Sequence, residues 1–329
     1  MNTMRAFRLH GVRDARLETL PVPEPGRREL LVKVDACGIC PTDVRKYQIG
    51  VNDGELPFNP GHEWTGHVVA VGDGVSDWSL GQRVFGDTYT GYAEYSLISV
   101  DPRPWSYGAL PLDDGLPVDR AVFIEPLACS LHALHDQARL APGERLVVVG
   151  AGQMGLQLAA AGAVGGARVH VVEPRADRRE LAVALGAEST SSPEDWPTSV
   201  RDWGDGRGAD VVVLSIGNPD LIDPAMRALD TQGRLVLFAG FGNRGTATVD
   251  VNLLHYQEIS VIGTTAAGVP PREQWGRYEQ ARDLLTDGTL KLESLVSGHC
   301  DLDGVLDAFD DVAAQRVLKT VLVPGGLNR

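Results

Sequence analysis

A glycine-rich turn between an apolar stretch and a helix-forming stretch constrains this chain more than any other feature. The turn reads GAGQMG, begins at Gly150 and follows the apolar run LVVV. In βαβ units that bind dinucleotides, glycines placed like Gly150, Gly152 and Gly155 permit a tight turn, a close approach to the pyrophosphate and close packing of helix on strand. The amino end of the helix attracts phosphate groups. We therefore expect this turn, with Gln153 and Met154, to bind a dinucleotide.

A carboxylate at the end of the next apolar stretch indicates which dinucleotide. Glu173 closes the run RVHVVE. A carboxylate at this place accepts hydrogen bonds from the ribose hydroxyls, and its charge repels a 2′-phosphate, so the sequence favours NAD over NADP. Arg175 and Arg178 follow closely and could instead bind a 2′-phosphate, which keeps NADP as the alternative.

The order of the expected elements indicates two domains. Up to about residue 120, short runs such as ELLVKVDA and AEYSLISV alternate with Gly, Pro and Asp turn signals, which is typical of β-rich structure. From about residue 145, apolar strands alternate with helical stretches. We therefore expect a doubly wound parallel sheet that is buried on both faces.

Composition excludes several classes of function. The formal net charge of −14 argues against a nucleic-acid partner, which would need clustered Lys and Arg. No apolar run reaches the roughly 18 residues of a membrane span, so we expect no membrane partner. The amino-terminal segment carries scattered charges and no apolar core like that of a secretory signal, so we expect a cytoplasmic protein.

The segment CGIC, residues 37–40, has the spacing of a paired-cysteine motif. A structural zinc site would need a second Cys or His pair at suitable spacing, and the other two cysteines do not offer one. The segment PTD follows directly, and GHE occurs further along the chain. These segments suggest that only one of the two cysteines, Cys37 or Cys40, is a metal ligand.

Taken together, CGICPTD and GHEWTGHVVAVG resemble the medium-chain zinc-dependent alcohol dehydrogenases. The segment IEPLA, residues 124–128, is similar to the branch of polyol (sorbitol) and threonine dehydrogenases. The resemblance covers essentially the whole chain, and it implies an α/β protein of two parts. A GroES-like β-rich catalytic domain would comprise residues 1–126 and 267–329, and a Rossmann NAD-binding domain would comprise residues 127–266.

The resemblance implies one catalytic zinc ion per chain. Cys40 and His62 would be ligands, and either Glu125 or Glu63 would be the third, with Glu125 favoured by its position. Asp43 would orient His62 by accepting from its other ring nitrogen. Many members insert a four-cysteine lobe that holds a structural zinc, but here GQRVFGDTYTGYAEYSL contains no cysteine, so we expect no second zinc.

The same resemblance implies the handling of the proton. Zinc polarises the substrate oxygen as a Lewis acid. Thr42 stands where the family has a hydroxyl that bonds the substrate oxygen and passes the proton on. Arg45 occupies the place of a relay histidine, and arginine does not release its proton usefully. Water could complete the relay, or Arg45 could instead contact a phosphate or a polar substrate.

The implied activity is NAD-linked interconversion of a secondary alcohol and its ketone, with a polyol, sugar, cyclitol or amino alcohol as substrate. Tyr47, Trp64 and Tyr89 are compatible with a pocket for a polar substrate. A tryptophan placed like Trp64 in GHEW is also seen in aminocyclitol dehydrogenases, which this chain resembles. The alternatives are an epimerase that retains its NAD, a metal-free quinone or enoyl reductase, and a non-catalytic binding protein on the same fold. We expect a homodimer or homotetramer, with EISVIGTT, residues 258–265, as an edge strand that pairs across subunits.

Overall fold

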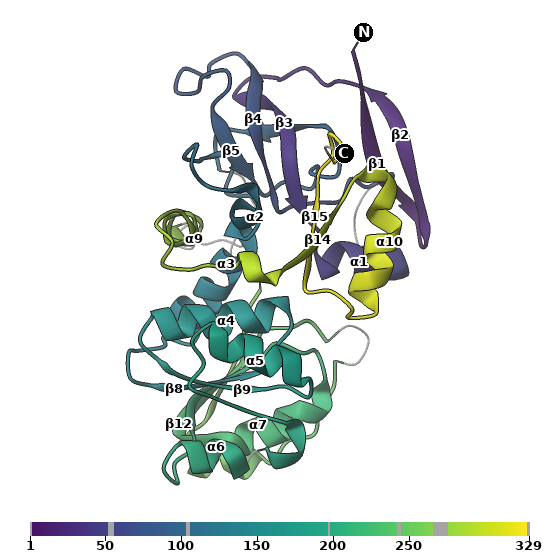
Figure 1. Cartoon of the computed structure of the whole chain (residues 1–329). Helices are drawn as coiled ribbons and strands as arrows, with labels where there is room; N and C mark the ends of the chain where they lie inside the picture. Colours follow the sequence, from purple (N-terminus) through teal and green to yellow (C-terminus); the bar gives the residue numbers. More distant parts are fainter. Residues whose placement is uncertain are drawn as a thin grey trace. The chain divides into compact units, whose positions relative to one another are not determined.

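The computed structural model describes residues 2–51, 56–102, 106–196, 198–241, 245–265 and 276–327. The chain forms two compact units (Figure 1). The first consists of Met1–Pro126 and Gly268–Arg329, and the second of Leu127–Ala267.

The first unit is β-rich. Its main sheet has seven strands in the order β14-β15-β3-β4-β5-β7, with β6 also paired to β3, and β1 and β2 form a separate antiparallel pair. The strands are β1 (Thr3–Gly11), β2 (Asp14–Pro21), β3 (Glu29–Gly38), β4 (Trp64–Val71), β5 (Arg83–Gly86), β6 (Tyr95–Ser99), β7 (Leu110–Pro111), β14 (Val296–Cys300) and β15 (Lys319–Leu322). The helices are α1 (Pro41–Ile49), α2 (Val118–Ala121), α9 (Gly276–Thr286) and α10 (Val305–Ala313). A further helix, α3 (Ile124–Leu131), begins in this unit and ends in the second.

The core of this unit explains why its loops are held in place. Trp64 is fully buried, and its indole nitrogen donates to the carbonyl of Thr88 at 2.9 Å. A Cβ atom on Gly86 would lie 2.1 Å from the Trp64 ring, so only glycine permits this packing. Cys37 and Phe309 belong to the same core. The packing fixes the ends of β3 and β4, from which the candidate site is built.

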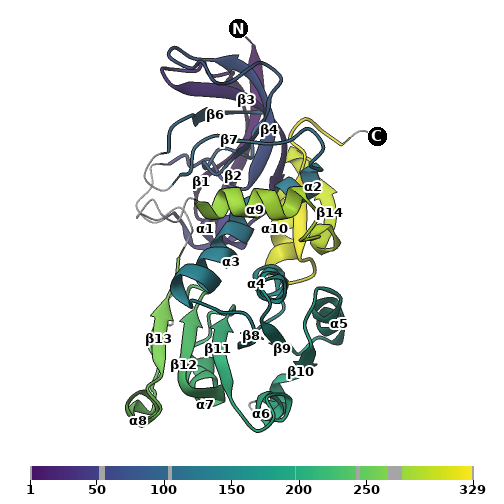
Figure 2. The same cartoon turned by 90° about the vertical axis from the view of Figure 1, so that its left-hand side faces the viewer.

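The second unit is a parallel sheet of six strands in the order β10-β9-β8-β11-β12-β13 (Figure 2). The strands are β8 (Arg145–Val149), β9 (Arg168–Val172), β10 (Ser189–Ser191), β11 (Ala209–Leu214), β12 (Leu229–Leu237) and β13 (Ser260–Gly263). The helices are α4 (Gln153–Val164), α5 (Ala176–Ala184), α6 (Thr198–Trp203), α7 (Ile222–Ala228) and α8 (Val251–Tyr256). A π-helical segment, His132–Gln137, extends α3.

The central strands of this sheet are largely apolar. Every residue of β8 is buried, as a strand covered on both faces requires. Figure 1 shows α4 and α5 on one face and α6 and α7 on the other. The predicted fold class, a GroES-like domain with a Rossmann sheet, is confirmed. Among the described residues, no helix is both long enough and apolar enough to span a bilayer.

Candidate active site

Cys40 is positioned by the start of α1. The backbone at Cys40 is extended, with φ −97° and ψ 136°, and Pro41 occupies the first helical position. Proline suits that position because its fixed φ is already helical and its missing N–H would have no partner there. The thiol therefore lies at a defined point just after β3. Cys37, in contrast, is fully buried in the core.

His62 and Glu63 lie directly before β4. The Gly38 N–H donates to the carbonyl of Glu63 at 2.8 Å, which ties this segment to the end of β3. Gly61 has φ +90°, and a Cβ atom there would lie 2.3 Å from the Tyr92 ring. Glycine is therefore required at this position, because both the backbone conformation and the space exclude a side chain.

These segments bring three different metal-binding side chains together. One ligand atom each from Cys40, His62 and Glu63 lies within 4.8 Å of the others. His62 is 8% exposed and Glu63 only 1%. Sulfur, nitrogen and oxygen ligands in one group are the donor set of catalytic rather than structural zinc sites. The three side chains fit a zinc ion.

Glu63 also forms a fully buried ion pair with Lys319, the first residue of β15. A Cβ atom on Gly38 would lie 2.2 Å from the Glu63 carboxylate, so glycine leaves room for the pair. Lys319 was not predicted as a residue of the site. The only available signal was a lysine inside the apolar run VLKTVLV of a chain that has few lysines.

Glu125 lies in the first turn of α3 and is 8% exposed. Among the described residues, it does not belong to the group that Cys40 forms with His62 and Glu63. Its charge nevertheless contributes to raising the pKa of His62. The structure thus groups Glu63, and not Glu125, with the other two predicted ligands.

Asp43 lies beside His62, but the hydrogen bond predicted between them is not formed. Its Oδ2 atom is 3.7 Å from Nδ1 of His62, which is too long for a hydrogen bond. Among the residues that the structure describes, neither Asp43 oxygen nor Nδ1 of His62 has a hydrogen-bond partner. Burial raises the pKa of Asp43. Burial lowers the pKa of His62, but the charges of Cys40 and Asp43 outweigh this effect and raise that pKa well above its usual value.

The other residues predicted for the site differ in their exposure and in their contacts. Thr42 and Arg45 are exposed. The Tyr89 ring packs against His62 with 4.6 Å between ring centroids. Tyr47 packs against Phe309 of the core, and Trp64 is a core residue as well. Of the three aromatic residues considered for a substrate pocket, Tyr89 is thus the one in contact with a predicted ligand.

The glycine turn of the second unit has the geometry expected of it. Gly150 has φ +98°, and a Cβ atom on Gly155 would lie 1.9 Å from the Gly150 carbonyl oxygen. Gly152 caps α4, which begins with Gln153 and Met154. Any side chain at position 155 would push the helix away from the strand, so the close packing of α4 on β8 depends on this glycine.

Glu173 supports this turn. Its carboxylate accepts from the N–H groups of Ala151 at 2.8 Å and Arg175 at 3.1 Å. Arg179, which the sequence analysis did not consider, donates to the carbonyls of Glu173 and Pro174. The carboxylate therefore lies next to the turn that is predicted to hold the pyrophosphate.

The two arginines considered for a 2′-phosphate are placed differently. The guanidinium of Arg175 is exposed and binds both carboxylate oxygens of Asp177. Arg178 is buried. Asp177 therefore competes with any anion for Arg175.

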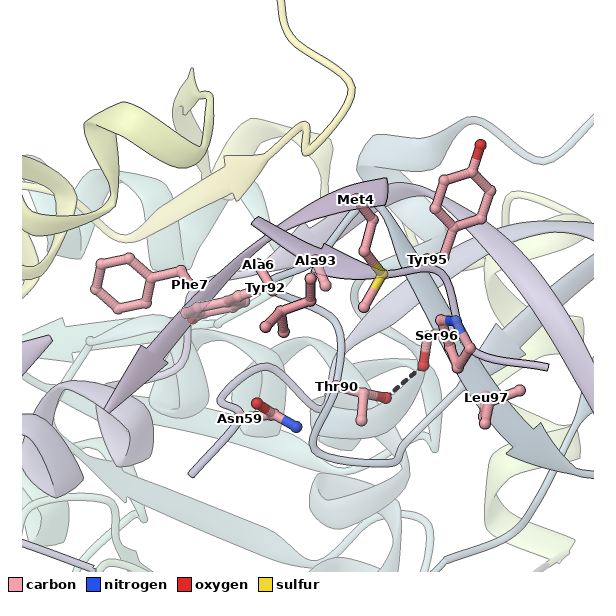
Figure 3. A pocket seen from close by; sticks show the side chains of 12 residues that line it. Met4, Ala6, Phe7, Asn59, Thr90, Tyr92, Ala93, Tyr95, Ser96 and Leu97 are labelled. Atoms are coloured by element: carbon pink, nitrogen blue, oxygen red, sulfur yellow. Dashed lines mark hydrogen bonds between the residues drawn. The ribbon is translucent and has the colours of Figure 1, made fainter. Parts of the chain in front are cut away.

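A separate cavity of about 230 Å³ lies among apolar side chains of the first unit (Figure 3). Met4 and Ala6 of β1 line it together with Tyr95 and Leu97 of β6. Thr90 and Ser96 hydrogen-bond at its edge. Its lining includes none of the metal-binding side chains, so it is distinct from the candidate site.

Comparison with known proteins identifies the family. Residues 26–105 match the family model "Alcohol dehydrogenase GroES-like domain", and residues 150–287 match "Zinc-binding dehydrogenase". Sorbitol dehydrogenase of Ovis aries is 30% identical, over 92% of this chain and 91% of the relative. L-threonine 3-dehydrogenase of Pyrococcus horikoshii is 28% identical, over 94% and 95%.

A solved structure shows the same fold. It is a putative zinc-binding dehydrogenase from Sinorhizobium meliloti bound to NADP, with a TM-score of 0.87 and 25% identity over 98% of this chain and 100% of that one. The matched domains, the sequence relatives and the common fold agree. The chain therefore belongs to the medium-chain zinc-dependent alcohol dehydrogenase superfamily, in the branch of polyol and threonine dehydrogenases, and is an oxidoreductase that acts on alcohols.

Proposed function

We propose that the protein is a zinc-dependent, NAD-linked dehydrogenase that interconverts a secondary alcohol and its ketone. The observation that carries this proposal is the group formed by Cys40, His62 and Glu63 in a chain of this family. The substrate class is a small polyhydroxylated alcohol, which includes polyols, sugars and cyclitols, or an amino alcohol. The relatives named sorbitol and threonine dehydrogenase support this range.

Cys40 and His62 would hold the metal, with Glu63 or Glu125 as the third ligand. When bound, zinc would supply a Lewis acid for the substrate oxygen. The pairing of Glu63 with Lys319 opposes its binding to a metal, so Glu125 remains the alternative. Asp43 would accept from the ring N–H of His62 and so hold the ring in one orientation. The exposed hydroxyl of Thr42 would accept the substrate's proton and pass it towards solvent.

The cofactor proposed is NAD. Glu173 places a carboxylate beside the glycine turn, and Asp177 occupies the nearest exposed arginine. Both features disfavour a 2′-phosphate. The Glu173 carboxylate repels it, and the pairing of Arg175 with Asp177 removes a positive charge that could bind it. Initial rates with NAD and with NADP, measured side by side, test this cofactor preference.

The test of the site compares two cysteines of one segment. Cys40→Ser should lose the bound zinc, because loss of a ligand removes a large share of the metal affinity. Its activity should therefore fall by roughly 100-fold or more. It should keep NAD binding, because the glycine turn belongs to the other unit. Cys37→Ser is the matched control and should keep its zinc. Zinc is measured by elemental analysis, NAD binding by calorimetry, and activity by nicotinamide absorbance with polyols, cyclitols and amino alcohols.

Three outcomes would contradict the proposal. Wild-type protein without zinc would favour a metal-free reductase. Unchanged activity in Cys40→Ser would remove the metal from the mechanism. Cofactor retained through purification, with no net NADH formed from any alcohol, would indicate an epimerase instead.

A further inference from the structure

A lysine lies over two aromatic rings next to the predicted metal ligands. Nζ of Lys46, on α1, is 3.5 Å from the centroid of the Tyr89 ring and 4.6 Å from that of Phe58. The two rings are 5.2 Å apart, and the Tyr89 ring is itself 4.6 Å from the ring of His62. The ammonium group and the His62 ring therefore both contact the ring of Tyr89.

This ammonium group has no carboxylate partner among the described residues. Its contacts there are the two rings, and the negative groups that act on it are Asp43 and Cys40. Lys319, in contrast, is fully buried and has Glu63 in direct contact. A half-buried ammonium group without an anion is costly, because aromatic faces replace only part of its hydration. The energetic gain from an added anion is correspondingly large.

The position also remains open to a ligand. Lys46 is partly exposed, Tyr89 is 38% exposed, and Thr42 on the same helix is exposed. The distance from Nζ of Lys46 to the His62 ring cannot exceed the sum of two distances, that from Nζ to the Tyr89 ring and that from the Tyr89 ring to the His62 ring. A substrate that carries its reacting hydroxyl at the metal would span this gap with a few carbon atoms.

We propose that Lys46 binds an anionic group of the substrate, a carboxylate or a phosphate, on a carbon near the reacting hydroxyl. This inference rests on the proposed dehydrogenase function and narrows its substrate class. It favours hydroxy acids and phosphorylated polyols over neutral polyols. It disfavours amino alcohols, because an ammonium group would meet the charge of Lys46.

Four three-carbon compounds that share a secondary hydroxyl on C2 test the inference. They are glycerate, glycerol 3-phosphate, glycerol and 3-amino-1,2-propanediol. The wild-type enzyme should have a kcat/KM for at least one of the two acids about 10- to 100-fold above that for glycerol, the range of a charge-assisted hydrogen bond. The amine should be the poorest substrate. The preference for glycerate or for glycerol 3-phosphate distinguishes a carboxylate site from a phosphate site.

Variants assign the effect to one side chain. Lys46→Met should lose the preference for acids, because kcat/KM should fall more for the two acids than for glycerol, whereas Lys46→Arg should keep the preference. Lys33→Met is the matched control, because Lys33 is an exposed lysine of β3 in the same unit, and it should change nothing. An equal loss for all four compounds in Lys46→Met, or wild-type enzyme without any preference for acids, would overturn the inference.

An equilibrium measurement separates this inference from the proposed function. Glycerol 3-phosphate and glycerate are titrated calorimetrically into zinc-loaded protein without cofactor. Binding of either acid that weakens about tenfold or more in Lys46→Met, and not in Lys33→Met, supports the anion site even if no alcohol is oxidised. Identical binding of both acids to wild type and Lys46→Met excludes it even if neutral alcohols are oxidised.

Discussion

Glu63 and Lys319 show how strongly one residue of the site depends on another. Both side chains are buried, at 1% and 0% exposure, and they lie 256 positions apart in the sequence. Removing one partner of a buried pair leaves an uncompensated charge, which costs more than the intact pair contributes. A Cβ atom at position 38 would clash with both side chains, so the pair also depends on Gly38.

We expect Lys319→Met to lower the free energy of unfolding by about 3 to 5 kcal/mol, since the Glu63 carboxylate loses its counter-charge. Denaturant unfolding of the zinc-stripped protein measures this. The double variant Glu63→Leu with Lys319→Met should be more stable than Lys319→Met alone. Lys291→Met, at an exposed lysine, should cost less than about 0.5 kcal/mol. Equal costs for the two lysines would show that the pair does not stabilise the fold.

The residues of the site differ in how far the sequence could predict them. Cys40, His62 and Glu63 stand in short local motifs, and the structure brings their ligand atoms together. Lys319 could not be assigned to them, because its contact depends on the pairing of β15 with β3. The contact of Lys46 with Tyr89 joins a helix to a distant loop and has no local pattern either.

At the scale of elements, local patterns were sufficient for the parallel sheet. The apolar run before Gly150 forms β8, and α4 begins at Gln153, within the predicted turn. Periodicity shows which elements form, because burial on both faces demands continuous apolar strands. It does not show what a carboxylate at a strand end binds. Glu173 was expected to face the ribose, and its bond to the Ala151 N–H became visible only in the structure.

The strand β9 also carries a buried histidine that makes the sheet sensitive to acid. His170 is 1% exposed and shares a hydrogen bond of 2.9 Å with Ser191 of β10. Burial lowers the pKa of His170 to about 4. The folded protein therefore keeps this ring neutral at pH values where the unfolded chain, with an ordinary pKa of about 6.5, binds a proton.

We expect His170 to destabilise the fold progressively as the pH falls from about 6.5 towards 4, by about 3 kcal/mol at the end of that range. Above pH 6.5 it should have no such effect, because both states are then neutral. In His170→Gln this part of the pH dependence should disappear, whereas His255→Gln, at an exposed histidine of α8, should retain it. Denaturant midpoints from pH 4 to 8 measure the difference. Parallel pH profiles for wild type and His170→Gln would contradict the assignment.

At the scale of the whole molecule, the chemistry is divided between the two units. The metal-binding group belongs to the first and the glycine turn to the second. The second unit also ends its sheet with β13, which pairs with β12 on one side and is the outermost strand among those described. An edge strand offers unpaired N–H and C=O groups to another chain. Val261 of β13 is 44% exposed.

We expect the protein to form a homodimer, or a tetramer built from such dimers, in which two β13 strands pair and join the two sheets. Val261→Lys should reduce the oligomer, because a lysine on an edge strand must be desolvated for pairing and meets its own symmetry mate. Val183→Lys, at an exposed valine of α5 in the same unit, is the control and should leave the oligomer intact. Analytical ultracentrifugation over a concentration series gives the association state, and circular dichroism confirms folding. If Val261→Lys associates as strongly as the wild-type protein, β13 does not form the interface. If the wild-type protein is a monomer, the expected assembly is wrong.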